Sequence, residues 1–371
     1  MKAETRYLQE IKKIVSEEAF QERYTRNREV DFTRKRKLDF AETMLAVVGN
    51  GRGPAYLEAE RFSDAAGCTV SDTAIRKARA KIDPEAFYEL FWRTAAMVPQ
   101  EKKYHGYQLI AVDGMKGELP KTPELTEKYC RSGAQSPLFH AIAAYDVMND
   151  VYLDALFHFG CASEHEYGVK LIDRFTERSK KVPRIWIFDR GFPALRLLQR
   201  LNRRKENYVM RVSSSFLKEV NEFAKGKAVD KEVQICYTER RAVTSRVTSD
   251  GELNFQLRCV RVKLDGQKDE ILVTNLDRKE FPKRYLKEIY GLRWGIETAY
   301  NFLKNAVFVE EFTSRKEYGI QQDFYSTLIA DNFITCACGS IWADMPLKKA
   351  QIAQAEAQIP DKPQKCVPHA L

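Results

Sequence analysis

Five short apolar runs, separated by turns and amphipathic stretches, constrain the fold of this chain most strongly. They are YQLIAVDG (107–114), FHAIAAYDV (139–147), VYLDALFHF (151–159), RIWIFDRG (184–191) and NYVMRV (207–212). Their β-branched and aromatic residues are typical of strands. The first three runs follow one another as a meander, whereas helical segments stand before and after the fourth. We therefore predict an α/β fold in which a mixed sheet is flanked by helices.

Two local signals predict where these flanking helices begin. Ser163 is followed three residues later by Glu166, which is a capping-box pattern. Pro193 stands where the first turn of the helix after the fourth run is expected, a position that proline tolerates.

The remaining segments differ in their predicted secondary structure, and this difference divides the chain into domains. Residues 1–100 are predicted to be helical, and residues 101–212 together with 281–345 to form the core that contains the sheet. Residues 213–280 hold further strand-like runs and are predicted to be an all-β insertion. Residues 346–371 are expected to form a polar tail.

The charge balance of the chain points to an anionic partner. Among its 371 residues, 61 are Lys or Arg and 52 are Asp or Glu, which gives a formal net charge of +9. Nucleic acid is the most common partner of such a protein. The eight cysteines form no CxxC pair or Cys/His cluster, which argues against structural zinc. Because neither a signal peptide nor a membrane-spanning run is recognisable, we expect a reducing, cytoplasmic setting.

Two basic segments lie near the N-terminus. Residues 23–37 are rich in Arg and Lys, and such a run is most often a solvated face. Residues 68–83 are predicted to contain a helix capped by Ser71 or Asp72. A basic helix after a short turn can enter a groove of DNA, so we expect residues 1–100 to bind DNA. The candidate contacts on this helix are Arg76, Lys77 and Arg79.

Two acidic residues occur in matching contexts. Asp113 ends an apolar run in AVDGM, and Asp189 ends another in IFDRG. A single acid in such a place is usually a turn or cap residue. Strand ends are also where open α/β folds place functional groups, and two neighbouring carboxylates can share a divalent cation. Magnesium prefers carboxylate oxygens and keeps several waters, so it needs few protein ligands.

The segment KRYLKEIYGLRWGIETAYNFLKN is predicted to form one helix with two stripes. At about 100° per residue, four polar residues share an arc of roughly 60°. They are Tyr290, Arg293, Glu297 and Lys304. The neighbouring arc can face the core, and it holds Ile289, Leu292, Ile296, Tyr300 and Leu303. The polar stripe spans about 21 Å of helix rise, so its members cannot all meet at one cation. Geometry alone favours an amphipathic surface helix; the functional alternative is an acid at a metal with cations along a phosphate backbone.

The spacing of these four residues resembles a known signature. Tyr290, Arg293, Glu297 and Lys304 reproduce the YREK pattern of the insertion-sequence-four group of bacterial DDE transposases. Asp113 and Asp189 resemble the first two acids of that family, and a β-rich segment between the second acid and the Glu is also its layout. The resemblance covers residues 30 to 340, although Gly114-Met115 stands where the family often has a small hydroxyl residue.

This resemblance implies a ribonuclease-H-like catalytic core and a metal-dependent reaction on DNA. Asp113, Asp189 and Glu297 would be the catalytic residues and the ligands of magnesium or manganese, with two ions expected. One ion would activate the nucleophile and the other would stabilise the leaving oxygen. The nucleophile would be water in the first cut and a 3′-hydroxyl in strand transfer.

The same resemblance implies contacts and partners. Tyr290, Arg293 and Lys304 would contact the transposon-end DNA, and the neighbouring Arg190 and Trp294 are further candidates, with local packing as the alternative. The partners would be double-stranded DNA, both inverted-repeat ends and target, bound by a homodimer in a synaptic complex. No membrane is involved, and the expected location is the bacterial cytoplasm, with the nucleoid.

Three function classes remain open. The first is a transposase that cuts and pastes an insertion sequence. The second is a catalytically impaired, truncated transposase that only binds DNA, which the short segment after Glu297 allows. The third is another nuclease with the same core, such as a resolvase, in which the Tyr-Arg-Glu-Lys stripe is not expected.

Overall fold

The computed structural model describes residues 2–34, 36–51, 53–236, 254–263 and 269–344. The expected polar tail lies outside these residues. Contacts divide the chain into two compact units. We call Gln100–Tyr300 the sheet unit, and Met1–Pro99 with Asn301–Leu371 the helical unit. The sequence-based division assigned all of residues 281–345 to the sheet-containing core; the contacts instead assign the chain from Asn301 onward to the helical unit.

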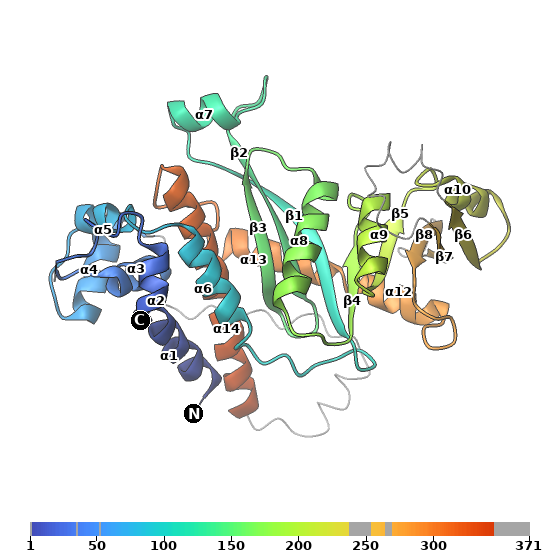
Figure 1. The fold of residues 1–371 in the computed structure, drawn as a ribbon, viewed down its shortest axis with the longest axis horizontal. Coiled ribbons are helices and arrows are strands. Elements are labelled where there is room, and N and C mark those ends of the chain that lie inside the picture. Colours follow the sequence, from blue (N-terminus) through green and yellow to red (C-terminus); the bar gives the residue numbers. More distant parts are fainter. Residues whose placement is uncertain (1, 35, 52, 237–253, 264–268, 345–371) are drawn as a thin grey trace. The chain divides into compact units, whose positions relative to one another are not determined.

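The sheet unit is built on one mixed sheet, in which the described strands follow the order β3-β2-β1-β4-β5-β8-β7-β6 (Figure 1). The strands are β1 (Gln108–Glu118), β2 (Leu138–Asp146), β3 (Val151–Phe159), β4 (Arg184–Phe188), β5 (Asn207–Val212), β6 (Asp230–Cys236), β7 (Asn254–Lys263) and β8 (Asp269–Thr274). β4 is parallel to both of its neighbours, β1 and β5, and all other pairs are antiparallel. The predicted mixed sheet and its first five strands are therefore confirmed.

The sheet unit also contains helices, several of which pack on the sheet. They are α7 (Pro123–Tyr129), α8 (Glu164–Arg178), α9 (Leu195–Arg203), α10 (Lys218–Lys225), α12 (Lys283–Gly291) and α13 (Trp294–Asn305), whose last residues belong to the helical unit. α8 and α9 contact each other, α8 packs on β2 and β3, and α12 packs on β5 and β7 (Figure 1). The flanking layer buries residues that a strand alone would expose, such as Ile110 and Val112 of β1.

Of the two start signals, one is confirmed and one is wrong. The Ser163 side chain accepts a hydrogen bond from the N–H of Glu166, and α8 begins at the next residue, Glu164. α9, however, begins at Leu195 after the extended residue Ala194, so Pro193 precedes the helix. The reason is a turn after β4, in which the N–H of Phe192 bonds to the carbonyl of Asp189.

The expected all-β insertion is corrected in two ways. It contains the helix α10, and its described strands continue the main sheet instead of forming a separate one. β8 pairs with β5 from Val209↔Thr274 to Val212↔Ile271. Because an unpaired strand edge leaves backbone donors and acceptors without partners, the free side of β5 is covered by this pairing.

The helical unit joins the two ends of the chain. Its helices are α1 (Ala3–Ser16), α2 (Glu18–Tyr24), α3 (Phe40–Val48), α4 (Ala55–Ala66), α5 (Asp72–Arg79), α6 (Glu85–Ala95) and α14 (Glu317–Asp344). α14 packs against α1, α3 and α6 (Figure 1). Buried side chains such as Phe324, Tyr325 and Leu328 explain this assignment, because an apolar helix needs other helices to cover it.

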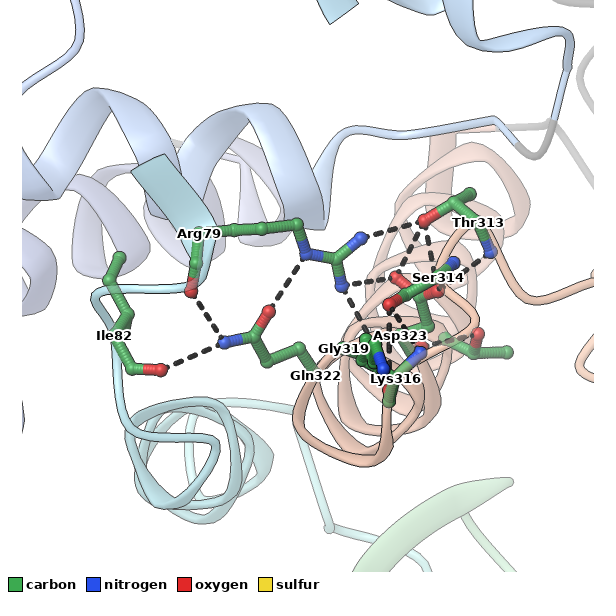
Figure 2. A network of polar contacts seen from close by, with 9 residues as sticks. Arg79, Ile82, Thr313, Ser314, Lys316, Gly319, Gln322 and Asp323 are labelled. Atoms are coloured by element: carbon green, nitrogen blue, oxygen red, sulfur yellow. Dashed lines mark hydrogen bonds and ion pairs between the residues drawn. The ribbon is translucent and has the colours of Figure 1, made fainter. Parts of the chain in front are cut away.

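A buried polar network fixes α14 to α5 within this unit (Figure 2). The Arg79 guanidinium donates to Gln322 Oε1 at 2.8 Å and to Asp323 Oδ1 at 2.7 Å. It also donates to the hydroxyl of Thr313 and the carbonyl of Gly319, both at 2.8 Å. Its donors are therefore paired with acceptors of the C-terminal segment, which is the condition under which a buried charge is tolerated.

None of the helices in the described ranges is long and apolar enough to cross a membrane.

Candidate functional site

The pairing of β1 with β4 brings the two predicted acids next to each other. The parallel pairing ends at Val112↔Phe188, and the next residues after this pair are Asp113 and Asp189. Only Asp189 follows a strand end. Asp113 lies inside β1, because that strand continues to Glu118 by pairing with β2, where Asp113 lies opposite Ala143. The strand-end position expected for Asp113 is thus wrong, but the two strands are neighbours as the hypothesis required.

The predicted single helix is also corrected. α12 ends at Gly291, and α13 begins at Trp294. In the turn between them, the N–H of Arg293 bonds to the carbonyl of Tyr290 at 3.1 Å, only three residues back. The N–H of Gly295 likewise bonds to Leu292 at 3.0 Å. Glycine is a poor residue inside a helix, and the two glycines flank this tighter turn. A constant 100° step therefore does not hold from Tyr290 to Lys304.

Despite this break, Tyr290 and Arg293 reach the carboxylates. The Tyr290 hydroxyl donates to Asp189 Oδ1 at 2.7 Å. One terminal nitrogen of Arg293 donates to Asp113 Oδ2 at 3.3 Å, and the other donates to Glu297 Oε1. One tyrosine and one arginine therefore connect three acids from β1, the end of β4 and the first turn of α13.

Burial and neighbouring groups shift the pKa values of the two aspartates in opposite directions. Burial raises the pKa of Asp113 to about 6, the charges of Asp189 and Glu297 add to this, and Arg293 and the Gly114 N–H oppose it. Burial also acts on Asp189, but the Tyr290 hydroxyl, the Arg190 N–H and the arginine charges overcome it and lower its pKa. Asp189 is therefore held ionised more firmly than Asp113.

Arg293 supplies the compensating positive charge. It is only 5% exposed and lies between Asp113 and Glu297. Burial by itself lowers the pKa of the guanidinium, but the surrounding anions and Tyr290 raise it above its ordinary value. Its Nε atom is buried and has no hydrogen-bond partner in the described part of the chain. The site thus binds a cation already, and that cation is a side chain.

The donor chemistry of this site fits a divalent metal ion. Carboxylate oxygens are the ligands that magnesium and manganese prefer. Within the described ranges, no three His, Cys, Asp or Glu side chains converge closely enough to hold an ion as they stand. Asp113 Oδ2 and Glu297 Oε1 instead accept from the Arg293 guanidinium, so these two oxygens can bind a metal ion only when the arginine gives up its contacts.

Two further residues support the site, and sequence reasoning missed this role. The buried hydroxyl of Tyr300 donates to the backbone carbonyl of Asp113 at 2.7 Å, although the sequence placed Tyr300 only in the apolar stripe. Its position one turn after Glu297 was the available signal. Arg211 on β5 lies 3.9 Å from Asp189 Oδ1 and forms an ion pair with Glu270; nothing in its sequence context marks it.

The other candidate residues lie away from this cluster or at its surface. Trp294 is 62% exposed at the start of α13, and Arg190 is exposed after Asp189. Lys304 belongs to the helical unit, where it pairs with Glu310 at 2.9 Å.

The basic helix α5 carries the remaining candidates. Ser71 caps it by accepting from the N–H of Ala74, as predicted. Arg76 and Lys77 are exposed, but Arg79 is 4% exposed and its guanidinium bonds to α14 (Figure 2). The expectation that Arg79 contacts DNA is therefore corrected: the fold uses this charge internally.

Fold and site together define a mixed α/β protein with a carboxylate cluster at neighbouring strands, completed by a helix. Residues 104–333 match the family described as the Transposase DDE domain, and the chain belongs to that family. The predicted membership of a DDE transposase family is therefore confirmed. A relative named as a transposase for insertion sequence element IS4SA, from Synechocystis sp. (strain ATCC 27184 / PCC 6803 / Kazusa), is 24% identical over 201 residues. The match covers 52% of each protein, so the chain spans about half the length of this curated relative.

Among solved structures, the chain is similar to a cryo-EM structure of the piggyBac transposase synaptic complex with hairpin DNA. The TM-score is 0.44 at 9% identity, with 96% of this chain and 86% of that chain covered.

Proposed function

We propose that this protein is a metal-dependent transposase that cuts DNA at the inverted-repeat ends of an insertion sequence and joins those ends to target DNA. The observation that carries the proposal is the cluster of Asp113, Asp189 and Glu297, connected by Tyr290 and Arg293, inside a domain of the transposase family. The strand order around the two aspartates supports a ribonuclease-H-like core.

In this proposal Asp113, Asp189 and Glu297 hold two magnesium or manganese ions. Bound ions of this kind activate the attacking oxygen and stabilise the leaving oxygen of a phosphodiester. Tyr290 keeps Asp189 ionised and oriented, and Tyr300 fixes the backbone at Asp113. Arg293 compensates the acids in the free protein and becomes available to a DNA phosphate once it leaves them.

The DNA partner is assigned from exposed basic and aromatic side chains. Arg190 and Trp294 flank the acids in sequence and are exposed, so they can contact the DNA end. Lys304 is proposed as a phosphate contact, and Arg76 and Lys77 of α5 as contacts of the helical unit. Pairing of two DNA ends by a homodimer, at bacterial DNA in the cytoplasm, completes the proposal.

Cleavage of a DNA fragment that ends in the element's own inverted repeat tests this function. Purified protein with magnesium is expected to nick the fragment at the end of the repeat. Glu297→Gln is expected to abolish cutting while end binding, measured by gel shift, stays within about threefold. Glu280→Gln, at an exposed acid outside the cluster, is the matched control and should cut normally.

Each other outcome has a clear meaning. Normal cutting by Glu297→Gln would contradict the assignment of the third acid. Binding of the repeat without cutting by the unaltered protein would favour the DNA-binding-only alternative. Cutting without preference for the repeat would favour a general nuclease.

A further inference from the structure

A fourth carboxylate lies against both segments that carry the aspartates. Glu164 is the first residue of α8, and its carboxylate occupies the space beside Gly191, two residues after Asp189. A Cβ atom at position 191 would overlap Glu164 Oε2, and one at Gly114 would lie 3.3 Å from Oε1. The absence of a side chain at these two positions is therefore what allows Glu164 to approach the backbone next to both acids.

This carboxylate has an unusual environment. Its side chain is 31% exposed, and no hydrogen bond reaches it from the residues that the structure describes. The side chain of His140 places Nε2 at 3.9 Å from Oε1, beyond hydrogen-bonding distance. A carboxylate that accepts no hydrogen bond from the described residues has its oxygens left for water or for a cation.

His140 independently points to a ligand at this place. Its side chain is 1% exposed, and its Nε2 atom is buried without a hydrogen-bond partner among the residues that the structure describes. That atom faces Glu164 and the backbone of Gly114, where a Cβ atom would lie only 2.6 Å away. The other ring nitrogen, Nδ1, faces the backbone of Ala162, with the carbonyl oxygen at 3.1 Å and the N–H at 3.2 Å. In the tautomer in which Nδ1 accepts from the Ala162 N–H, Nε2 carries the proton and can donate it to Glu164; the positioning role of His140 requires this tautomer.

Asp113 links this pair to the site already described, because its two oxygens face different neighbours. Oδ2 faces Arg293, which also binds Glu297. Oδ1 accepts from the N–H of Gly114 at 2.8 Å, and Gly114 is the residue that Glu164 and His140 approach. Asp113 therefore has one oxygen at the arginine that also binds Glu297 and one at the backbone of Gly114, the residue that Glu164 approaches.

We propose that Glu164 is a ligand of a second divalent cation, shared with Asp113 and Asp189, and that His140 is the positioning residue that orients it. This inference rests on the proposed function, because it assumes that the aspartates bind metal. In this arrangement Glu297 and Glu164 serve the two cation positions on either side of Asp113.

Manganese binding to the full chain tests this proposal without measuring activity. Free Mn²⁺ is measured by electron paramagnetic resonance during titration. The unaltered protein is expected to bind two ions, and Glu164→Gln to lose one of them or bind it at least tenfold more weakly, since loss of outer contacts alone commonly costs 10–100-fold in metal affinity. Glu166→Gln, an exposed acid on the same helical turn, is the matched control. Melting in EDTA checks that every variant is folded.

Two more variants separate a ligand from a structural residue. Gly191→Ala is expected to displace the Glu164 carboxylate and weaken the same ion, with little loss of stability, because the displaced atom is the end of a flexible side chain. His140→Gln, which keeps a donor, is expected to bind Mn²⁺ more tightly than His140→Leu.

The outcomes distinguish this inference from the proposed function. If Asp189→Asn abolishes Mn²⁺ binding but Glu164→Gln binds two ions like the unaltered protein, the fourth ligand is wrong and the three-acid site stands. If the unaltered protein binds no Mn²⁺ in the presence or absence of DNA, the metal-dependent function fails and this inference with it. Equal weakening by Glu166→Gln would also overturn it, because the effect would then be general charge.

Discussion

Replacement of Arg79 by methionine separates a structural from a DNA-binding role for the basic helix α5. Methionine keeps an unbranched apolar stem but removes the charge. Asp323, which is 0% exposed, then remains buried without its cationic partner. Loss of one member of a buried ion pair typically lowers the free energy of unfolding by about 3–5 kcal/mol. Whole domains are stable by only about 5–15 kcal/mol, so the effect on the helical unit should be large.

Hydrogen exchange measured by mass spectrometry reports this loss where it occurs. Peptides from α5 and α14 are expected to lose roughly two to three and a half orders of magnitude of protection, since about 1.4 kcal/mol corresponds to a factor of ten. Arg76→Met is the matched control on the same helix. Its side chain is 61% exposed and pairs with Asp72, so removing it should cost at most about 1 kcal/mol.

A double variant tests the reason for the effect. Arg79→Met with Asp323→Leu removes both charges and should restore part of the protection. The recovery is expected to be incomplete, because the N–H of Thr313 donates to Asp323 at 2.8 Å and loses this acceptor. Unchanged protection in Arg79→Met, combined with weaker DNA binding, would refute the reasoning and return Arg79 to the DNA surface.

Three further changes have defined outcomes. Tyr290→Phe removes a hydrogen bond to an ionised carboxylate and should lower the free energy of unfolding by about 1.5–3 kcal/mol at pH 7. The folded protein has a lowered pKa at Asp189, so the stability difference between Tyr290→Phe and the unaltered protein is fully present above the unfolded pKa of this aspartate. It should fade as the pH falls through the folded pKa. A difference in urea unfolding that persists in acid would contradict the assignment. Tyr300→Phe should cost about 0.5–1.5 kcal/mol in the same assay by freeing the carbonyl of Asp113, and no loss would show that this bond is dispensable. Lys77→Ala should leave unfolding unchanged but weaken DNA binding and reduce its salt slope by about 1 in filter binding, whereas an unchanged slope would exclude a phosphate contact.

Part of the candidate site could be predicted from local sequence patterns, and part could not. The apolar runs that end at Asp113 and Asp189 predicted two strands, because side-chain character along a strand is a local property; that these strands are neighbours follows from the sheet. The family resemblance implied that Tyr290, Arg293 and Glu297 act at one site. It could not show the turn at Leu292 and Arg293, since that break depends on where α12 and α13 pack.

What the sequence determined by itself is therefore local: five strands of the sheet, the caps at Ser71 and Ser163, and the residue types able to hold a cation. Only the tertiary structure decided which charged side chains are exposed and able to contact a partner. Arg76 and Arg79 stand three residues apart on one basic helix, yet one faces solvent and the other is buried against α14, more than 200 residues away along the chain. Likewise, Glu164 reaches the backbone beside Asp113 and close to Asp189 only because α8 packs on the sheet and two glycines leave room for its side chain. Such contacts join distant segments, and no local pattern records them.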